Sequence, residues 1–314
     1  MEKSVIKQNY LIFIVGATAI GKTALAIELA KYFGSEIVSC DSRQFFKEMT
    51  IGTAVPSPEE QAQIKHHFIQ NKSIHEHYNV GDYEKEVLPL LDRLFQQKNI
   101  QIVVGGSGLY VDAIAKGFDD FPEVSQSVKD EIDEIYDDKG MEGLQQILSE
   151  SDPEYFRFLK ENNPQTLVNP QRMKRFTAVC KAAGKPYSSF LNQEKNQRNF
   201  TSVFIGLEAP REIMYERINH RVDVMMKNGL LNEVAGLKEY QHLNALQTVG
   251  YRELFDYFDG RISLDQATEE IKKNTRRFAK RQVTWFKRNE STKWFSYNEP
   301  LQNIIAHIRA TIYE

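Results

Sequence analysis

Residues 16–23 read Gly16-Ala17-Thr18-Ala19-Ile20-Gly21-Lys22-Thr23, a complete G-x-x-x-x-G-K-[ST] phosphate loop. An apolar run at 11–15 precedes the loop, and a helical pattern at 23–33 follows it. In this strand–loop–helix context the glycines allow backbone amides to surround phosphate oxygens, while the Lys22 ammonium adds a positive charge. The helix dipole also favours an anion here, and the Thr23 hydroxyl can bind Mg²⁺. The sequence therefore predicts that residues 16–23 bind a di- or triphosphate group.

A second glycine-rich turn stands where a carboxylate is usual. P-loop NTPases generally hold their metal with an Asp at the end of a neighbouring strand. Here the strand-like run 100–104 ends in Gly105-Gly106-Ser107-Gly108, and the obvious acid is Asp41, directly after the run 36–40. A phosphate cradle with one carboxylate and an open turn suits a pyrophosphate leaving group with a nearby base better than it suits ATP hydrolysis.

The order of the expected elements predicts an α/β protein. Strand-like runs at 11–15, 36–40, 100–104 and 202–207 alternate with helical stretches, and a further run near 294–297 adds a last strand. This alternation predicts a P-loop NTPase-like parallel sheet with flanking helices. No convincing strand occurs within 119–198, where helical segments such as 127–136 and 172–183 are separated by proline-containing turns. We therefore expect a catalytic core of residues 1–118 and 199–314, with residues 119–198 as an inserted all-helical domain.

Composition limits the class of protein and the cellular compartment that we expect. The chain has 314 residues, a net charge of −3, 41% hydrophobic and 26% charged residues, which is ordinary for a globular protein. Cys40 and Cys180 form no spacing pattern, which fits a reducing compartment. No apolar run approaches the roughly 18 residues of a membrane span, and residues 11–20 are better explained as a buried strand than as a signal peptide. We expect a cytoplasmic protein that makes no use of a membrane, and nothing demands more than a monomer.

The C-terminal region contains a run of cations at helical spacing. Its members are Lys272, Lys273, Arg276, Arg277, Lys280 and Arg281, with Lys287 and Arg288 beyond them. On a helix they form two adjacent stripes about 24 Å long, which matches several phosphates of a nucleic-acid backbone. A solvated surface helix is the alternative. The only acids nearby are Glu269 and Glu270, and this lack of compensation favours contact with RNA.

Two other clusters receive structural interpretations. The histidines at positions 66, 67, 75 and 77 match no zinc-binding spacing, so a solvated loop or an RNA-facing surface is expected there. Trp285 and Phe286 are expected to anchor the basic helix to the core.

Seven stretches together resemble the tRNA dimethylallyltransferase family, also called isopentenyl-tRNA transferases. In chain order they are residues 16–23, Asp41-Ser42-Arg43-Gln44 with 51–54, 104–110, Asn169-Pro170-Gln171-Arg172-Met173-Lys174-Arg175, 217–222 leading to 229–230, Gln247-Thr248-Val249-Gly250-Tyr251-Arg252, and 275–282. They cover essentially the whole chain. The sequence departs from the family pattern at Val55, where Lys is frequent, at Ser107, where Thr is usual, and at Lys129, where Arg is expected.

The resemblance implies transfer of a dimethylallyl group from dimethylallyl diphosphate to N6 of the adenosine 3′-adjacent to the anticodon in tRNA, with Mg²⁺ as cofactor. It implies that Asp41, Ser107 and Arg221 are catalytic, that residues 16–23 bind the diphosphate, and that Thr23 is a metal ligand. The residues it implies for binding the tRNA anticodon stem-loop are Asp41, Ser42, Arg43, Gln44, Lys129, Gln171, Arg172, Met173, Lys174, Arg175, Gln247, Thr248, Val249, Gly250, Tyr251, Arg252, Arg276, Arg277, Lys280 and Arg281.

The residue chemistry agrees with this implication. Charge develops on the departing pyrophosphate, which Lys22 and the loop amides would stabilise, and the Asp41 carboxylate beside the acceptor amine is a candidate proton acceptor. A nucleotide or small-molecule kinase also explains residues 11–41, but not the basic helix or the second turn. An adenylate isopentenyltransferase acting on free nucleotide needs neither the insertion nor the basic helix. A non-enzymatic P-loop switch would leave Asp41 and Arg221 without a role.

Overall fold

The computed structural model describes residues 8–119, 121–191 and 197–313. The chain divides into two compact units. One unit, here called the core unit, consists of Met1–Lys116 together with Arg198–Glu314. The other, here called the inserted unit, consists of Gly117–Gln197. Each is described by itself.

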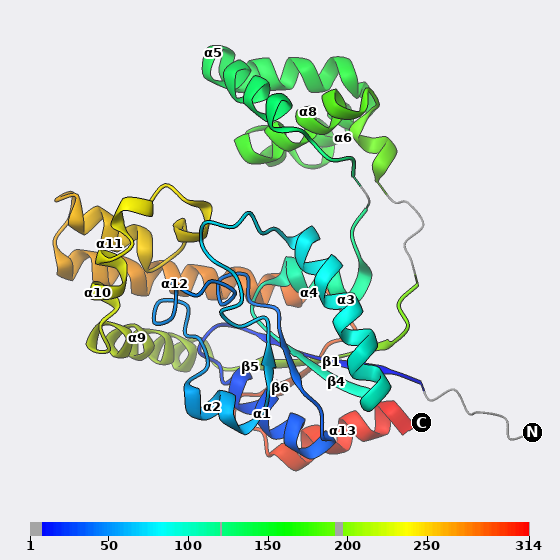
Figure 1. The fold of residues 1–314 in the computed structure, drawn as a ribbon, viewed down its shortest axis with the longest axis vertical. Coiled ribbons are helices and arrows are strands. Elements are labelled where there is room, and N and C mark those ends of the chain that lie inside the picture. The colour runs from blue at the N-terminus through cyan, green and yellow to red at the C-terminus, as the bar shows by residue number, and fades with distance from the viewer. Residues whose placement is uncertain (1–7, 120, 192–196, 314) are drawn as a thin grey trace, which may run out of the picture. The chain divides into compact units, whose positions relative to one another are not determined.

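The core unit is built on a six-stranded sheet in the order β3-β2-β4-β1-β5-β6, in which every pair of neighbours is parallel. The strands are β1 (Tyr10–Gly16), β2 (Ile37–Ser39), β3 (His66–His67), β4 (Ile100–Val104), β5 (Thr201–Glu208) and β6 (Lys293–Ser296). The predicted parallel sheet is therefore confirmed (Figure 1). The run expected at 36–40 forms a strand only at Ile37–Ser39.

Some helices of the core unit pack on the two faces of this sheet, and others pack on its loops and on one another. They are α1 (Lys22–Phe33), α2 (Pro58–Gln63), α3 (Val80–Gln97), α4 (Gly108–Lys116), α9 (Arg211–Lys227), α10 (Leu230–Ala235), α11 (Tyr251–Phe258), α12 (Leu264–Phe286) and α13 (Leu301–Tyr313), with short 3₁₀ helices η2 (Lys238–Tyr240) and η3 (Asn244–Leu246). Side chains alternate across a strand, so Leu11 and Phe13 of β1 pack with α3, α4 and α12, whereas Ile12 and Ile14 pack with α1 and α13. Burial on both faces explains why β1 is a continuous apolar run.

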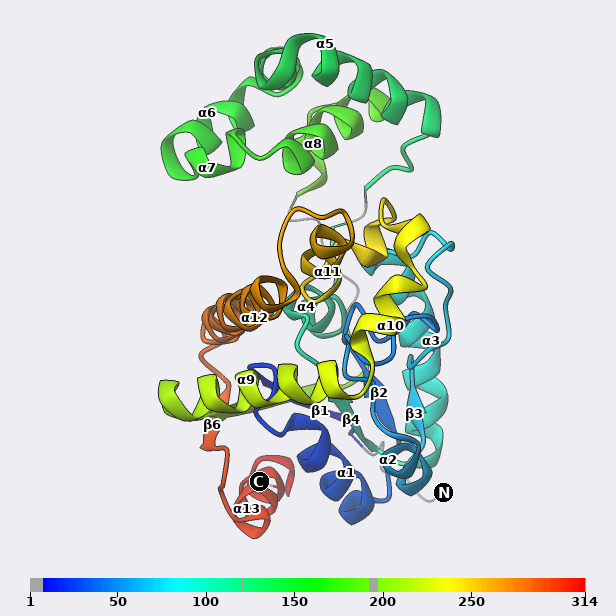
Figure 2. The ribbon, with the colours of Figure 1, turned by 90° about the vertical axis from the view of Figure 1, so that its left-hand side faces the viewer.

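A third hydrophobic cluster joins the helices from α9 to α12 to the loop after β2. It includes Phe46 and Met49 of that loop, Leu230 of α10 and Tyr251 of α11. Helices α9 and α12 lie side by side in this part of the core unit (Figure 2). The cluster therefore fixes the loop after β2, which contains Asp41, to the helices from α9 to α12.

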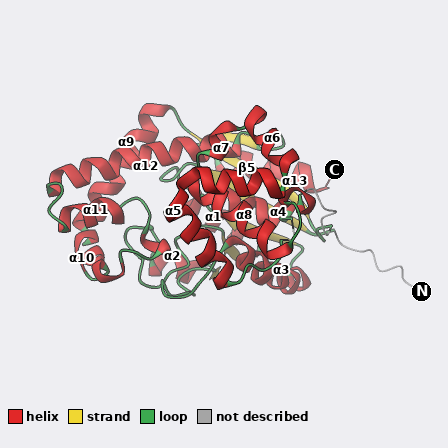
Figure 3. Cartoon of the chain, turned by 90° about the horizontal axis from the view of Figure 1, so that it is seen from above, coloured by secondary structure: helices red, strands yellow, loops and turns green. Residues whose placement is uncertain are grey.

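The inserted unit contains only helices and loops among its described residues (Figure 3). Its helices are α5 (Gln126–Ser151), α6 (Pro153–Asn162), α7 (Pro164–Leu167) and α8 (Pro170–Ala183), followed by the 3₁₀ helix η1 (Tyr187–Phe190). The predicted segments 127–136 and 172–183 lie within α5 and α8, which confirms them as helical. The unit has its own core, in which Leu144 and Leu148 of α5 pack with Met173 and Val179 of α8.

One expectation about the histidines was wrong. Residues 66 and 67 form the edge strand β3 rather than a solvated loop, because they pair with Ile37 and Val38 of β2. His67 Nε2 bonds to the Glu36 carboxylate, which precedes β2. His75 packs edge-on against Tyr240, and the part of the chain that the structure describes holds no cluster of three or more potential metal ligands. No helix among the described residues is long and apolar enough to cross a membrane.

Candidate active site

The phosphate loop joins β1, at the centre of the sheet, to α1. Strand β1 lies between β4 and β5, so the loop emerges where the chain connections run in opposite directions from the sheet, the usual ligand position in such folds. Backbone φ angles are positive at Gly16 (141°), Ala19 (63°) and Gly21 (112°). Gly21 caps α1, which begins at Lys22. The loop therefore wraps the helix N-terminus, as the sequence predicts.

Three cations are held against this loop. The Lys22 ammonium donates to the Ala17 carbonyl over 2.7 Å. Arg221, from α9, donates from Nη1 to the Thr18 hydroxyl over 3.2 Å. Arg217, one turn earlier, donates from Nε to the Ala19 carbonyl over 2.9 Å. Because α9 is about two hundred residues from the loop in sequence, only the fold brings these arginines to it.

The loop opens into a cavity of about 190 Å³. The cavity is lined by the phosphate loop and the start of α1, by the ends of β2 and β4, by the segment from the loop after β2 to just past β3, and by α9. The lining residues are Thr18, Ala19, Ile20, Gly21, Lys22, Thr23, Ala24, Ser39, Asp41, Gln44, Thr53, Ala54, Pro56, Glu60, His66, Ile69, Val104, Gly105, Gly106 and Arg221. The predicted cradle, Asp41 and Arg221 thus share one cavity.

Burial changes the acidity of the charged groups in this cavity. Burial, and then the neighbouring Arg221, lower the pKa of Lys22 to about 8. Burial also lowers the pKa of Arg221, with Arg217 adding to the effect. Cations that are poorly solvated and crowded together are stabilised by an anion, so the site favours an anionic ligand.

The lowered pKa of Lys22 predicts an alkaline limit to activity. In the free protein Lys22 loses its charge as the pH rises through about 8, so kcat/KM should fall above that pH. A Lys22→Arg variant keeps its charge, and its alkaline limb should move to higher pH even if its rate is lower. The measurement is a pH profile of kcat/KM for both proteins; coincident alkaline limbs would remove Lys22 as the cause.

Asp41 and Ser107 follow the ends of β2 and β4, and Ser107 contacts Ser42, the residue after Asp41. Asp41 Oδ1 accepts from the Arg43 amide over 3.1 Å, and Ser107 Oγ accepts from the Ser42 amide over 2.9 Å. Ser107 Oγ also donates to Ser42 Oγ over 3.1 Å. Burial raises the pKa of Asp41, opposed by the Arg43 amide and by Lys22. A carboxylate with a raised pKa is a stronger base, so this group can accept a proton in the cavity.

Glu233 of α10 is a site-forming residue that the sequence did not reveal. Its carboxylate accepts from three successive amides, those of Thr50 (3.0 Å), Ile51 (2.7 Å) and Gly52 (3.0 Å), and from the Tyr251 hydroxyl (2.6 Å). The next two residues, Thr53 and Ala54, line the cavity. No local pattern links Glu233 to a loop some 180 residues earlier, so sequence reasoning had no signal for it.

Burial excludes several of the residues that were predicted to contact RNA. The side chains of Met173 and Tyr251 are fully buried and Gly250 is also buried, so none of these three offers a surface for RNA. The Arg43 guanidinium donates to the Asn244 and Ala245 carbonyls, at 2.9 and 3.0 Å, and so fixes the Asp41 loop to η3. Of the others, Lys129, Gln171, Arg172, Arg175, Gln247 and Arg252 are exposed, while Lys174, Thr248 and Val249 are half-buried.

The basic helix α12 carries less free charge than expected. Lys272 pairs with Asp223 of α9 (2.8 Å) and with Glu269 (2.9 Å), and Lys273 pairs with Glu270 (2.7 Å). Arg276 donates to Asn219 Oδ1 over 2.6 Å. The expected lack of acidic partners was therefore wrong for the first turns. Further along the described helix, Arg277, Lys280 and Arg281 are exposed and make no ion pair.

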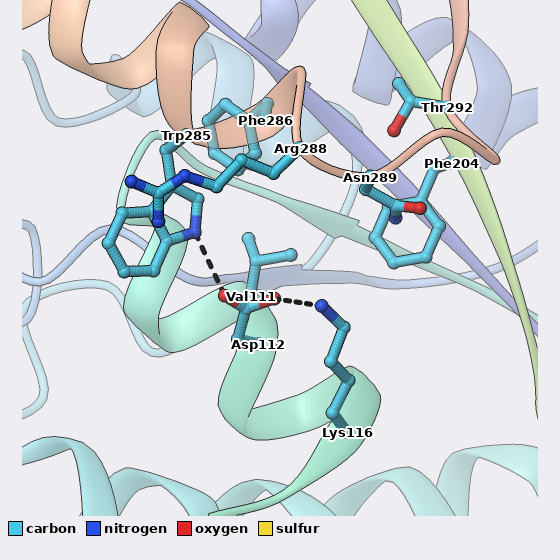
Figure 4. A pocket seen from close by; sticks show the side chains of 9 residues that line it. All are labelled: Val111, Asp112, Lys116, Phe204, Trp285, Phe286, Arg288, Asn289 and Thr292. Atoms are coloured by element: carbon cyan, nitrogen blue, oxygen red, sulfur yellow. Dashed lines mark hydrogen bonds and ion pairs between the residues drawn. The ribbon is translucent and has the colours of Figure 1, made fainter. Parts of the chain in front are cut away.

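The other face of α12 anchors it to the sheet. Trp285 Nε1 donates to Asp112 Oδ2 of α4 over 3.0 Å, and Asp112 also pairs with Lys116 over 3.2 Å (Figure 4). Phe286 is buried beside them, which confirms the expected anchoring role of Trp285 and Phe286. These side chains line a second cavity of about 180 Å³, and no residue predicted for the site lies on it.

A parallel α/β sheet with a phosphate loop after β1, and with the Asp41 carboxylate after β2 in the same cavity, defines a P-loop enzyme that acts on a phosphate-bearing substrate. Residues 44–289 match the family model described as IPP transferase. A tRNA dimethylallyltransferase of Flavobacterium johnsoniae is 62% identical over 308 residues, which cover 97% of this chain and 100% of that protein. The chain belongs to the IPP transferase family.

Solved structures agree with this assignment. The tRNA isopentenylpyrophosphate transferase of Bacillus halodurans is 32% identical with a TM-score of 0.70, and the match covers 98% of this chain and 96% of that one. A eukaryotic dimethylallyltransferase acting on tRNA has the same fold, with a TM-score of 0.83 at 24% identity, over 97% of this chain and 80% of that one.

Proposed function

We propose that this protein transfers a dimethylallyl group from dimethylallyl diphosphate to N6 of the adenosine 3′-adjacent to the anticodon in tRNA. The observation that carries the proposal is the single cavity that holds the phosphate loop, Arg221 and Asp41. The relatives named tRNA dimethylallyltransferase, with near-complete coverage of both chains, support the choice of substrates.

On the donor side, the protein stabilises the departing diphosphate. Breaking the bond between the allylic carbon and its oxygen leaves charge on the diphosphate, and fixed donors aimed at that charge lower the barrier. Lys22, Arg221 and the amides of the phosphate loop supply these donors. The Thr18 amide is excluded, because it donates to Gln282 Oε1 over 2.8 Å.

On the acceptor side, Asp41 accepts a proton. As N6 forms its bond to the allylic carbon, the carbon–oxygen bond to diphosphate breaks, and one N6 proton passes to the Asp41 carboxylate. Ser107 orients the acceptor through its hydroxyl, next to Ser42. An adenosine cannot reach this cavity while stacked, so it must be flipped out of the RNA.

The residues present fit a Mg²⁺ ion. Magnesium is usually held by one or two protein oxygens together with substrate phosphates. Thr23 lines the cavity, and its hydroxyl makes no hydrogen bond to another described residue, which leaves it free to be a ligand. Bound Mg²⁺ would neutralise diphosphate charge, and Thr23 would hold it at the N-terminus of α1.

Removing that hydroxyl should weaken the response to the metal. We expect Thr23→Ala to raise the Mg²⁺ concentration for half-maximal rate by at least about 10-fold, the scale found for groups that support a metal site. Thr23→Ser keeps the hydroxyl and is the matched control. The measurement is a Mg²⁺ titration of the transfer rate for the three proteins. An unchanged requirement in Thr23→Ala would show that the ligand has been wrongly assigned.

RNA binding is proposed for exposed residues only. On the core unit these are Gln247, Arg252 and the unpaired cations of α12; on the inserted unit they are Lys129, Gln171, Arg172 and Arg175. The cradle and Asp41 come from one chain, so a monomer is sufficient for the proposed reaction.

The test of the function is direct. The purified protein is incubated with dimethylallyl diphosphate and bulk tRNA, with dimethylallyl diphosphate and AMP, or with ATP alone. The products are identified by mass spectrometry. Prenylated adenosine in tRNA supports the proposal. Prenylated AMP would identify a nucleotide prenyltransferase, and phosphate release or transfer from ATP would identify a kinase or NTPase.

A further inference from the structure

Gln282 of α12 has a buried side-chain amide. Neither the phosphate-loop motif nor the strand ends of the sheet predict a role for it. Its side chain is 5% exposed. Oε1 accepts from the Thr18 amide of the phosphate loop over 2.8 Å, and Nε2 donates to the Gly106 carbonyl over 2.9 Å. An amide has one acceptor end and one donor end, and these partners require this orientation.

The two segments joined by Gln282 serve different substrates. The phosphate loop holds the diphosphate of the donor, and the Thr18 hydroxyl in turn binds Arg221. The turn that contains Gly106 continues into Ser107, which bonds to Ser42 beside Asp41. One side chain therefore spans the donor side and the acceptor side of the cavity.

Gly106 packs directly against the side chain of Gln282. A Cβ atom at this position would lie 2.2 Å from Gln282 Nε2 and 3.8 Å from Asp41 Oδ2. The helix that carries Gln282 is fixed one turn later by the bond from Trp285 to Asp112 (Figure 4). Gln282 is thus held on a rigid element, and is not a mobile side chain that follows the loops.

We propose that Gln282 is a positioning residue that sets the separation between the phosphate loop and the Gly106 turn, and hence between the allylic carbon and the acceptor N6. This inference rests on the proposed function. Reacting atoms must approach to about 3–3.5 Å in alignment, and a displacement of about 1 Å costs about 10²-fold in rate. Gln282 touches neither reacting atom, so its effect is on the geometry of attack.

The first test is Gln282→Met, which keeps the length of the side chain and loses both hydrogen bonds. The single-turnover rate of transfer should fall about 10²-fold, while the KM for dimethylallyl diphosphate and the Kd for tRNA stay near the wild-type values. Thr284→Val, at an exposed position of the same helix, is the matched control and should match wild type. An unchanged rate, or a loss confined to KM or Kd, would overturn the proposal.

The second test is Gln282→Glu, which measures how the rate depends on the two hydrogen bonds of this side chain. Burial beside the Gly106 carbonyl raises the pKa of the introduced carboxyl. When protonated, the carboxyl donates to Gly106 and accepts from Thr18, as the amide does. The ratio of variant to wild-type rate should therefore rise as the pH falls. A ratio independent of pH would overturn the proposal, even if Gln282→Met fails to fold.

The wild-type protein separates this inference from the proposed function. If wild type forms prenylated adenosine in tRNA and the variants behave as wild type, only the role of Gln282 is wrong. If wild type forms no such product, the proposed function itself fails.

Discussion

Asp41→Asn should lower the rate of transfer about 10²–10⁴-fold, the usual contribution of a positioned general base. Asparagine keeps the size of the side chain and an oxygen that can accept from the Arg43 amide, as Asp41 Oδ1 does over 3.1 Å. What it loses is the ability to accept a proton from N6. The fold of the loop and the affinity for tRNA should therefore remain close to those of wild type.

The measurement combines single-turnover transfer with tRNA binding for wild type and Asp41→Asn. Asp138→Asn, at an exposed position of α5 that is not among the residues lining the cavity, makes the same change of charge and serves as the control. Because burial raises the pKa of Asp41, the wild-type rate should also rise with pH through a value above that of an ordinary carboxyl, and this limb should vanish in the variant. Turnover close to wild type in Asp41→Asn would remove Asp41 from the mechanism.

Replacing Arg277, Lys280 and Arg281 together with Gln should weaken tRNA binding and flatten its salt dependence. Each phosphate that the protein no longer neutralises reduces the slope of log affinity against log salt by roughly 0.7–0.9, so three such phosphates should reduce it by about 2–3. These three are chosen because they are exposed and unpaired, whereas Lys272 and Lys273 are already neutralised by acids. The effect should be similar for different tRNAs, since phosphates carry no sequence information.

The matched control removes three exposed cations elsewhere on the core unit, at Lys98, Lys293 and Arg309. It has the same net charge, so a general loss of attraction would appear equally in both variants. The KM for dimethylallyl diphosphate should stay near wild type, because Gln282, rather than the exposed cations, joins α12 to the phosphate loop. Equal affinities and parallel salt plots for wild type and the α12 variant would contradict an RNA contact here.

Local patterns were sufficient for the elements that bear the chemistry. The phosphate loop, the apolar run of β1 and the glycine turn after β4 are each set by short stretches, whose backbone angles and burial depend on neighbouring residues. Asp41 and Ser107 follow strands of one parallel sheet, so their proximity was predictable once the strands were recognised.

Side chains that act over long sequence separations were not predictable in the same way. His67 was placed in a loop because β3 has only two residues and exists through its pairing with β2. Tyr251 and Met173 lie within matching motifs, but whether a residue faces a core or the solvent depends on what packs against its helix. The ion pair between Lys272 and Asp223 of α9 was not expected, because the two residues are 49 positions apart in the sequence.

The sequence by itself determined that this chain is a P-loop α/β protein with a helical insertion, a phosphate cradle and a basic helix. Only the tertiary structure decided how the cradle is completed, through Arg221 from α9, Glu233 from α10 and Gln282 from α12. The physical reason is that a hydrogen bond between residues some 180 to 260 positions apart leaves no periodic trace in either segment. Such contacts exist only when packing of the hydrophobic clusters has brought the segments together.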